Sequence, residues 1–212
     1  MNALVIYCHP RPESFTAAVR DTVVAALEAG GHAVQVIDLY AEGFDPVMSA
    51  TERHGYHDEG PNILPVRDHV DRLSAAEMVV FVYPTWWFGL PAMLKGWLER
   101  VLVPGFAFHM PSEKKGSRPM LHKIRRVVAV TTCGATPLTS WLMGQPGRRT
   151  LLRGFRSVCH PFCRTQYLAL YRMDTVSADA RLKHLERVRK TFTKHGAAKR
   201  PTAIPSDTCE IG

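Results

Sequence analysis

The chain has 212 residues, of which 46% are hydrophobic and 22% are charged. These proportions are typical of one globular domain with a substantial core. No apolar run approaches the roughly 20 residues that span a bilayer, which excludes insertion into a membrane.

Basic residues outnumber acidic ones: 27 Lys and Arg stand against 19 Asp and Glu, so the net charge is +8. This excess favours an anionic partner. The basic residues are scattered and do not alternate with aromatic residues, so we expect no nucleic acid partner. A phosphorylated nicotinamide cofactor and a solvated basic face are both compatible with the charge.

The first predicted strand is the short apolar run Ala3–Cys8. Its apolar part, Ala3–Tyr7, is shorter than the core of a signal peptide and has no basic segment before it, so we predict a cytoplasmic protein. A helix is predicted from Ser14 to Glu28, and it stops at Gly30-Gly31.

The loop between this strand and this helix is a candidate anion site. A helix N-terminus offers free N–H groups and the positive end of a dipole. Here His9 and Arg11 add charge or donors, and Ser14 and Thr16 add hydroxyl groups. Ser14 is also typical of a plain helix N-cap, a role compatible with phosphate binding. The loop matches neither the dinucleotide fingerprint nor the Walker loop, which disfavours a nucleotide-binding Rossmann domain or an NTPase.

The most informative segment is YPTWWFGLPAMLKGWLERV, from Tyr83 to Val101. The apolar run Met78 to Tyr83 predicts a strand that is buried on both faces and ends at Pro84. Pro91 is typical of the first turn of a helix, and apolar residues repeat at helical spacing after it. These residues are Leu94, Trp97, Leu98, Val101 and Leu102.

The aromatic elbow between this strand and this helix consists of Thr85, Trp86, Trp87, Phe88 and Gly89. In open α/β sheets, ligands bind at the carboxyl ends of the strands. Three adjacent aromatic residues there favour a flat, conjugated ring, although a core or interface role is the alternative.

A further strand, Val127–Thr132, runs into Thr131-Thr132-Cys133-Gly134, a third loop at the same sheet edge. Together with Ala33–Ile37 and Gln166–Tyr171, the apolar runs make five strands that alternate with helices. Such alternation predicts an α/β fold, with a doubly wound five-stranded parallel sheet and helices on both faces.

Five cysteines in a chain without a secretory signal are typical of reduced thiols. Cys159 and Cys163 flank His160, but a second pair of ligands is missing from this pattern, so we expect buried thiols and no metal site.

The last helix is predicted from Ala178 to Thr193, with Leu182, Leu185, Val188 and Phe192 facing inward. Its opposite face is basic and mostly solvated. We expect residues 1–195 to form the domain and residues 196–212 to form an irregular tail. The basic face comprises Arg181, Lys183, Arg187, Arg189, Lys190 and Lys194.

On the elbow and its helix, the chain resembles the flavodoxin-like NAD(P)H:quinone oxidoreductases, including the DT-diaphorase type and its short bacterial relatives. The resemblance implies a flavodoxin-like domain that takes hydride from NAD(P)H onto a bound flavin and passes two electrons to a quinone. It also implies a homodimer with the pocket at its interface, and FAD as the flavin, with FMN as the alternative.

The resemblance also implies roles for individual residues. It places the flavin phosphates at His9, Ser14, Phe15 and Thr16, and the flavin ring along Thr85 to Phe88 and the loop Thr131 to Gly134. Arg181 matches an arginine that reaches the adenosine part of FAD. The implied substrate pocket comprises Trp87, Phe88, Phe106, Ala107 and Phe108. We add Trp141 as a pocket wall in place of a family ring that this chain lacks, with a core role as the alternative.

One loop departs from the family. The tyrosine and histidine proposed to relay a proton in the best-known members are absent from Ala135–Gln145, so we assign no catalytic acid. Two other functions remain as alternatives: an ancillary subunit of a potassium-efflux system, and a one-electron carrier of the flavodoxin type.

Overall fold

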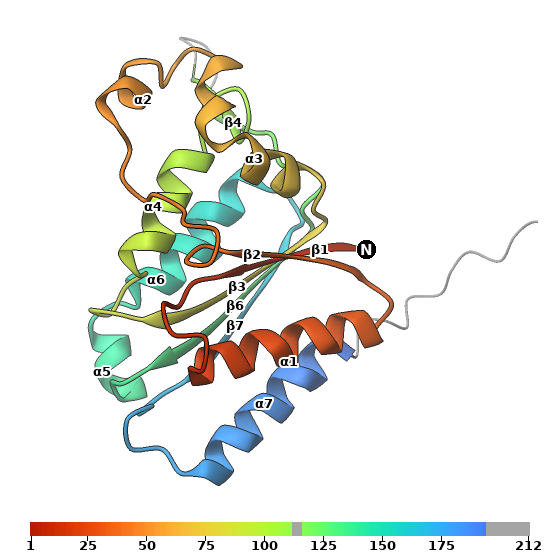
Figure 1. Ribbon diagram of the computed structural model, residues 1–212, viewed down its shortest axis with the longest axis vertical. Coiled ribbons are helices and arrows are strands. Elements are labelled where there is room, and N and C mark those ends of the chain that lie inside the picture. The colour runs from red at the N-terminus through yellow and green to blue at the C-terminus, as the bar shows by residue number, and fades with distance from the viewer. Residues whose placement is uncertain (112–115, 194–212) are drawn as a thin grey trace, which may run out of the picture.

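A five-stranded parallel sheet organises the protein in this computed structural model, which describes residues 1–111 and 116–193 (Figure 1). The strand order is β2-β1-β3-β6-β7, and neighbouring strands pair in parallel. This confirms the predicted doubly wound sheet. The strands are β1 (Asn2–Tyr7), β2 (Ala33–Asp38), β3 (Met78–Thr85), β6 (Arg126–Cys133) and β7 (Arg164–Leu170). The predicted tail, 196–212, and Lys194 lie outside the described residues.

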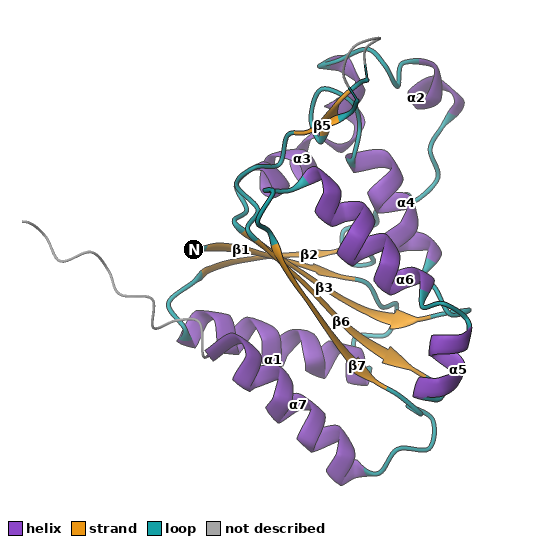
Figure 2. Ribbon diagram, turned by 180° about the vertical axis from the view of Figure 1, so that it is seen from behind, coloured by secondary structure: helices purple, strands orange, loops and turns teal. Residues whose placement is uncertain are grey.

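Helices cover both faces of the sheet. Figure 2 shows α1 (Phe15–Ala29) and α7 (Ala178–Thr193) on one face. It shows α3 (Arg67–Ser74), α4 (Ala92–Val101) and α6 (Pro146–Arg149) on the other. Shorter elements connect them: α2 (Ala50–His54), α5 (Pro137–Leu142), a π-helical turn (Thr150–Gly154), two 3₁₀ segments (Pro61–Val66 and Phe155–Val158) and a hairpin of β4 (Phe108–His109) and β5 (Arg118–Pro119).

Each face of the sheet has its own core. On the α4 side, Phe81 packs edge-on against Trp97 and Phe155. On the α1 side, Val80 and Val82 pack with residues of α1 and α7. Because β3 and β6 are covered on both faces, their sequences are almost continuously apolar instead of alternating.

Two predicted boundaries near the elbow were wrong by one or two residues. β3 continues through Pro84 to Thr85, because both residues still pair in register with Thr132 and Cys133 of β6. Pro91 is the residue before α4 and not part of its first turn, since its backbone is extended, with ψ of 146°.

The prediction that Leu182 faces inward was also wrong: its side chain is 66% exposed. The buried residues of α7 are His184, Val188 and Phe192, spaced four residues apart along one face. Leu182 is two residues from His184, about 200° around the helix, so it lies on the opposite face.

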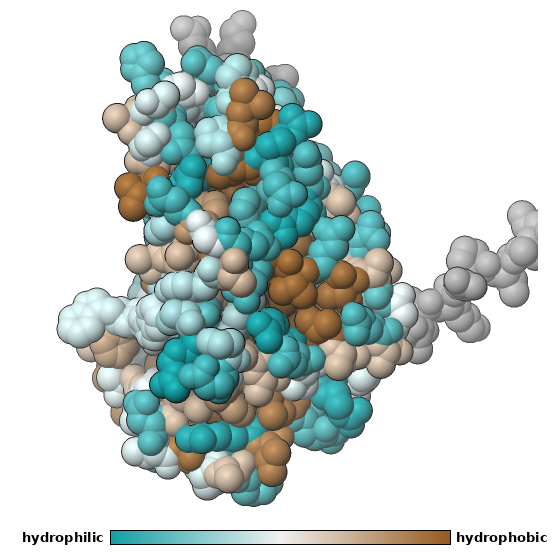
Figure 3. Space-filling model, viewed as in Figure 1, coloured by the Kyte–Doolittle hydropathy of each residue, from teal (hydrophilic) through white to brown (hydrophobic). Residues whose placement is uncertain are grey.

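The surface in Figure 3 is mostly hydrophilic, with a small hydrophobic patch over the β2 edge of the sheet. Val34 and Val36 of β2 are only partly buried there. Within residues 1–111 and 116–193, no helix combines the length and apolar character needed to cross a membrane.

Candidate functional site

A cleft of about 410 Å³ lies at the carboxyl ends of β1, β3, β6 and β7. Four loops from distant parts of the sequence meet there, as expected for the ligand edge of a doubly wound sheet. Its volume is within the usual range for small-molecule sites. The cleft is lined by His9, Ser14, Phe15, Thr16, Pro84, Thr85, Trp86, Trp87, Thr132, Cys133, Gly134, Met173 and Asp174.

The aromatic elbow forms a tight turn from Trp86 to Gly89, closed by a hydrogen bond of 2.9 Å from Gly89 N to Trp86 O. The two central residues, Trp87 and Phe88, both have positive φ, at 48° and 62°. Positive φ at both central positions defines a type I′ turn, in which Gly or Asn is usual. Bulky aromatic residues in this conformation cost about 1–3 kcal/mol each, and such strain concentrates at functional sites.

The N-terminus of α1, where the sequence predicts an anion site, borders the cleft. Ser14 is the N-cap, as expected, and its Oγ accepts a hydrogen bond from Ala17 N at 3.1 Å. The first N–H groups of a helix have no acceptor within it, so those of Phe15 and Thr16 can bind a ligand. The site can therefore hold a phosphate by dipole and direct hydrogen bonds.

His9 lies beside this helix N-terminus and beside Trp86, with ring centroids 6.2 Å apart. Its Nδ1 accepts a hydrogen bond from Arg11 N at 3.0 Å. Burial lowers the pKa of His9, so the imidazole is mainly neutral near pH 7. With Nδ1 occupied as an acceptor, Nε2 carries the proton and can donate to a ligand.

Side-chain hydroxyl groups connect the loops beneath the cleft. Thr85 Oγ1 and Thr131 Oγ1 are 2.9 Å apart, and Thr16 Oγ1 and Thr132 Oγ1 are 3.4 Å apart. Thr131 is almost fully buried and does not line the cleft, so its side chain supports the elbow from below.

The loop after β7 contributes two cleft residues that we did not predict, Met173 and Asp174. Its backbone is fixed to the loop after β6, since Met173 N donates to Cys133 O at 3.0 Å. A Cβ on Gly134 would lie 2.7 Å from Asp174 Oδ2, so the Asp174 carboxylate lies directly against this loop. Asp174 follows the fifth predicted strand, so the rule that identified the other three loops would have identified it too.

Several residues predicted for the site do not line this cleft. Phe88 of the elbow is half-buried, and Trp141 is 68% exposed on α5. Arg181 lies on the first turn of α7, with its Nε buried and without a partner among the described residues. Phe106, Ala107 and Phe108 follow the far end of α4 and pack against the core on that side of the sheet.

The residues present fit a flavin. The elbow turn offers a flat aromatic wall, the α1 terminus offers N–H donors for a phosphate, and the Thr132–Gly134 loop offers backbone groups at the opposite wall. The Asp174 carboxylate accepts hydrogen bonds, which suits hydroxyl or N–H groups of a ligand and not a second phosphate.

Comparisons with known proteins place the chain in a family. The family of flavodoxin-like fold matches residues 1–195. Rat NAD(P)H dehydrogenase [quinone] 1 (Rattus norvegicus) is 33% identical over 205 residues, which cover 87% of this chain and 73% of the rat protein. An uncharacterised NAD(P)H oxidoreductase of Haemophilus influenzae is 36% identical over 111 residues, 51% of this chain and 54% of that protein.

Among solved structures, a protein of Streptococcus mutans is 29% identical, with a TM-score of 0.81 over 92% of this chain and 100% of that one. The chain spans about half the length of several further curated relatives that it matches. The matched range, the identity to the rat enzyme and the shared sheet agree, and we conclude that the chain belongs to the flavodoxin-like family of NAD(P)H:quinone oxidoreductases.

Proposed function

We propose that the protein binds a flavin in this cleft and transfers two electrons from NAD(P)H to a quinone or a related aromatic acceptor. The observation that carries the proposal is the convergence of the elbow turn, the α1 N-terminus and the β6 loop on one cleft. A bound flavin supplies the hydride and electron chemistry, which no side chain of the cleft can perform.

The chain's own residues position the reactants. The N–H groups of Phe15 and Thr16 and the Nε2–H of His9 hold phosphate, and the backbone of Thr85 to Phe88 borders the flavin ring. The loop from Thr132 to Gly134 faces the ring from the other wall, where fixed N–H dipoles stabilise negative charge. We assign no side chain as a proton donor, because residues 135–145 contain neither tyrosine nor histidine.

We also propose a homodimer, because the pocket is incomplete in one chain. Phe106 and Phe108 lie beyond the far end of α4 and are half-buried, so only those of a second copy could wall this cleft. Ala107 is fully buried in its own chain and cannot do so. Large apolar side chains are exposed near the cleft and would be buried in such an interface. They are Trp87 at 95% and Leu138 at 67% exposure.

Reconstitution tests the function directly. The purified chain is incubated with FAD or with FMN, desalted, and assayed for flavin absorbance and for NAD(P)H oxidation with a benzoquinone. We expect bound flavin and ping-pong kinetics, since donor and acceptor use one pocket in turn. No flavin absorbance after incubation with either cofactor would refute the proposal.

The same experiment separates the two alternatives. An ancillary subunit would bind a membrane transporter, and its oxidation of NAD(P)H would not depend on quinone. A one-electron carrier would transfer electrons to quinones singly and not in pairs. The relatives are named as quinone dehydrogenases and NAD(P)H oxidoreductases, which favours the enzyme. A cytoplasmic location remains a prediction.

For the choice of flavin we propose FAD, through Arg181. Its buried Nε has no partner among the described residues, and buried polar groups of this kind normally have one. A hydrogen bond from the guanidinium group to the second phosphate or the adenosine of FAD contributes about 1.5–3 kcal/mol, or one to two decades in affinity. FMN has no atoms there.

Arg181→Ala should therefore weaken FAD binding ten- to hundredfold and leave FMN binding nearly unchanged. Quenching of flavin fluorescence by the apoprotein measures both affinities. Arg189→Ala on the same helix is the control, because Arg189 is exposed and paired with Glu186. Equal FAD affinities before and after the Arg181 substitution would make FMN the better assignment.

A further inference from the structure

The positive charge of the chain is concentrated in one segment. Residues 116–173 contain ten Lys or Arg and no Asp or Glu, whereas the whole chain has a net charge of +8. The remainder is therefore slightly acidic, and the segment is a strongly cationic region with no acidic partner of its own. Its basic residues are Arg118, Lys123, Arg125, Arg126, Arg148, Arg149, Arg153, Arg156, Arg164 and Arg172.

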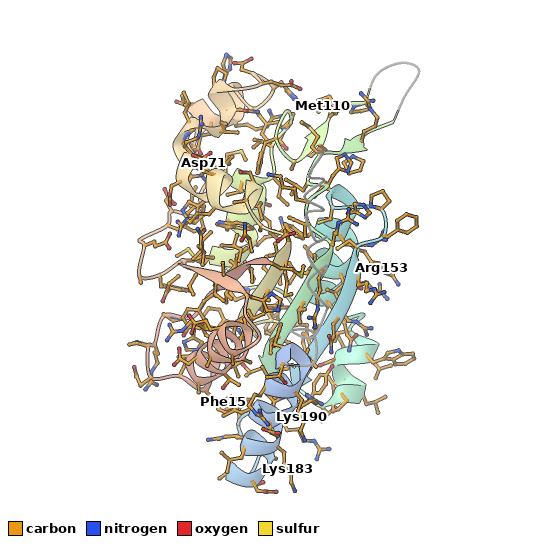
Figure 4. The ribbon with its side chains drawn as sticks, turned by 90° about the vertical axis from the view of Figure 1, so that its right-hand side faces the viewer. Phe15, Asp71, Met110, Arg153, Lys183 and Lys190 are labelled. Carbon is orange, nitrogen blue, oxygen red and sulfur yellow. The ribbon has the colours of Figure 1, made fainter. Side chains whose placement is uncertain are left out.

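Three of these arginines line one groove. The groove has a volume of about 660 Å³, and Arg148, Arg149, Arg153 and Trp141 lie along it. All three arginines are exposed, and Figure 4 shows Arg153 projecting outward from the surface. None of the ion pairs within the described residues involves them. The groove thus has an unneutralised charge suited to a compact polyanion.

The three arginines differ in how they are held. Arg148 donates to Gln145 Oε1 at 2.8 Å, and its guanidinium group lies 5.3 Å from the ring centre of Tyr167. These contacts fix Arg148 within the fold. Among the described residues, the side chains of Arg149 and Arg153 have no such hydrogen bond, so their donors are free for a ligand.

One end of the groove lies beside the loops of the cleft. Gly147, at the start of α6, packs against the elbow: a Cβ built on it would lie 3.3 Å from the carbonyl carbon of Gly89. On the other side, Gln145 Nε2 donates to the Tyr171 hydroxyl at 3.2 Å, two residues before the cleft residue Met173. The Gln145 end of the groove therefore lies next to loops of the cleft, although no residue lines both hollows.

We infer that this groove binds the adenosine end of the electron donor and that its arginines select NADPH over NADH. The inference rests on the proposed function. NADPH differs from NADH by one phosphate on the adenosine ribose, and arginine is the side chain that best matches phosphate. The exposed indole of Trp141 offers a flat face on which adenine can stack. NADH carries only a hydroxyl group at the ribose position where NADPH carries this phosphate.

Binding of donor fragments tests this without any turnover. Isothermal titration of the full-length chain compares adenosine 2′,5′-bisphosphate, adenosine 3′,5′-bisphosphate and adenosine 5′-monophosphate. We expect the 2′,5′-bisphosphate to bind at least tenfold more tightly than the monophosphate, with an advantage that shrinks as salt is added. Equal binding of the two bisphosphates would mean general anion attraction and would overturn the inference.

Substitutions test the residues. Arg149→Gln and Arg153→Gln should each lower the ratio of kcat/KM for NADPH to that for NADH ten- to hundredfold. Each should also lower the affinity for adenosine 2′,5′-bisphosphate by a similar factor. Arg125→Gln is the matched control, because Arg125 is exposed and precedes β6 at the opposite sheet edge. Circular dichroism verifies that each variant is folded. An unchanged ratio in both folded variants contradicts the inference.

Failure of the inference is distinguishable from failure of the proposed function. If the wild-type chain with bound flavin oxidises NADH and NADPH with equal kcat/KM, the donor assignment is wrong and the oxidoreductase stands. If it oxidises neither and binds no flavin, the proposed function is wrong. Tight binding of the 2′,5′-bisphosphate in that case would still support the groove as a site for phosphorylated adenosine.

Discussion

The sequence, the backbone strain and the exposure of Trp87 all indicate a functional role for this residue. It has φ of 48°, and its side chain is 95% exposed beside a cleft, although burial of a tryptophan normally stabilises the folded protein. The turn fixes the backbone of Trp87, with the closing hydrogen bond from Gly89 N to Trp86 O. The side chain is therefore available to a bound substrate, and the backbone to a bound flavin.

Replacing Trp87 should separate these two tasks. In Trp87→Ala we expect kcat/KM for quinones to fall at least tenfold, a loss of about 1.4 kcal/mol or more. We expect the flavin dissociation constant to change by less than threefold, because the elbow backbone remains. Stopped-flow reduction and flavin fluorescence measure the two quantities.

The control for this variant is Phe162→Ala, another highly exposed aromatic residue, at 85%, which precedes β7 at the opposite edge of the sheet. It should leave both quantities unchanged. A Trp87→Ala protein that keeps its circular dichroism spectrum but loses flavin entirely would contradict the division of roles.

The position of α4 depends on Gly96, which lets the segment around Pro46 pass close to the helix. A Cβ on Gly96 would lie 2.1 Å from the carbonyl oxygen of Pro46 and 2.5 Å from the Cβ of Pro46. The segment around Pro46 is further tied to α4 by the ion pair between Arg100 and Glu52, at 2.6 Å. Since the elbow directly precedes α4, this contact also fixes the elbow.

Gly96→Ala should destabilise the protein by about 1–2 kcal/mol. Helix propensity favours Ala by about 1 kcal/mol, but overpacking against a backbone atom costs about 1–3 kcal/mol or more. Urea unfolding measures the difference. The matched control is Gly154→Ala, because Gly154 has helical φ of −60° and nothing within 4 Å of an added Cβ. A Gly96 variant as stable as the Gly154 variant would show that the Pro46 segment yields easily.

Across the whole molecule, buried histidines link stability to pH. Burial is the main cause that lowers the pKa of His32, His69 and His184, and for His184 the pKa falls to about 4. His184 lies where α7 packs on α1, near the Phe15 ring, and its Nδ1 is 2.9 Å from an Arg187 nitrogen. The arginine donates to a neutral imidazole, and a protonated ring would lose that hydrogen bond.

The folded protein should therefore lose stability as the solution is acidified. The unfolded chain binds protons at these histidines near pH 6.5, and the folded chain does so only at lower pH, so stability is complete above about pH 6.5 and falls towards about pH 4. His184 contributes about 2 kcal/mol of the loss between pH 8 and pH 5. Denaturant unfolding at both pH values measures it.

In His184→Gln, which keeps a neutral acceptor for Arg187, this part of the pH dependence should disappear. His57→Gln is the control, because His57 is exposed on the loop after α2. If the wild type and His184→Gln lose the same free energy of unfolding between pH 8 and pH 5, then His184 titrates normally in the folded state.

Much of the fold follows from short-range pattern. The five apolar runs became the five strands, and Ser14 caps its helix as predicted, because strand burial and helix capping depend on residues within a few positions of one another. The cleft loops were found for the same reason: the carboxyl ends of parallel strands always meet at one edge. The flavin was predicted only from the resemblance to the family, because neither composition nor spacing could identify it.

The remaining features depend on contacts between segments far apart in the chain. β3 extends through Pro84 because β6 lies beside it, and Leu182 is exposed because α1 contacts the opposite side of α7. The positive φ of Trp87 and Phe88, the approach of Asp174 to Gly134 and the gathering of Arg148, Arg149 and Arg153 along one groove also appear only once the chain is packed. Local propensity cannot encode them, because packing a segment against a distant neighbour can outweigh what its own sequence prefers.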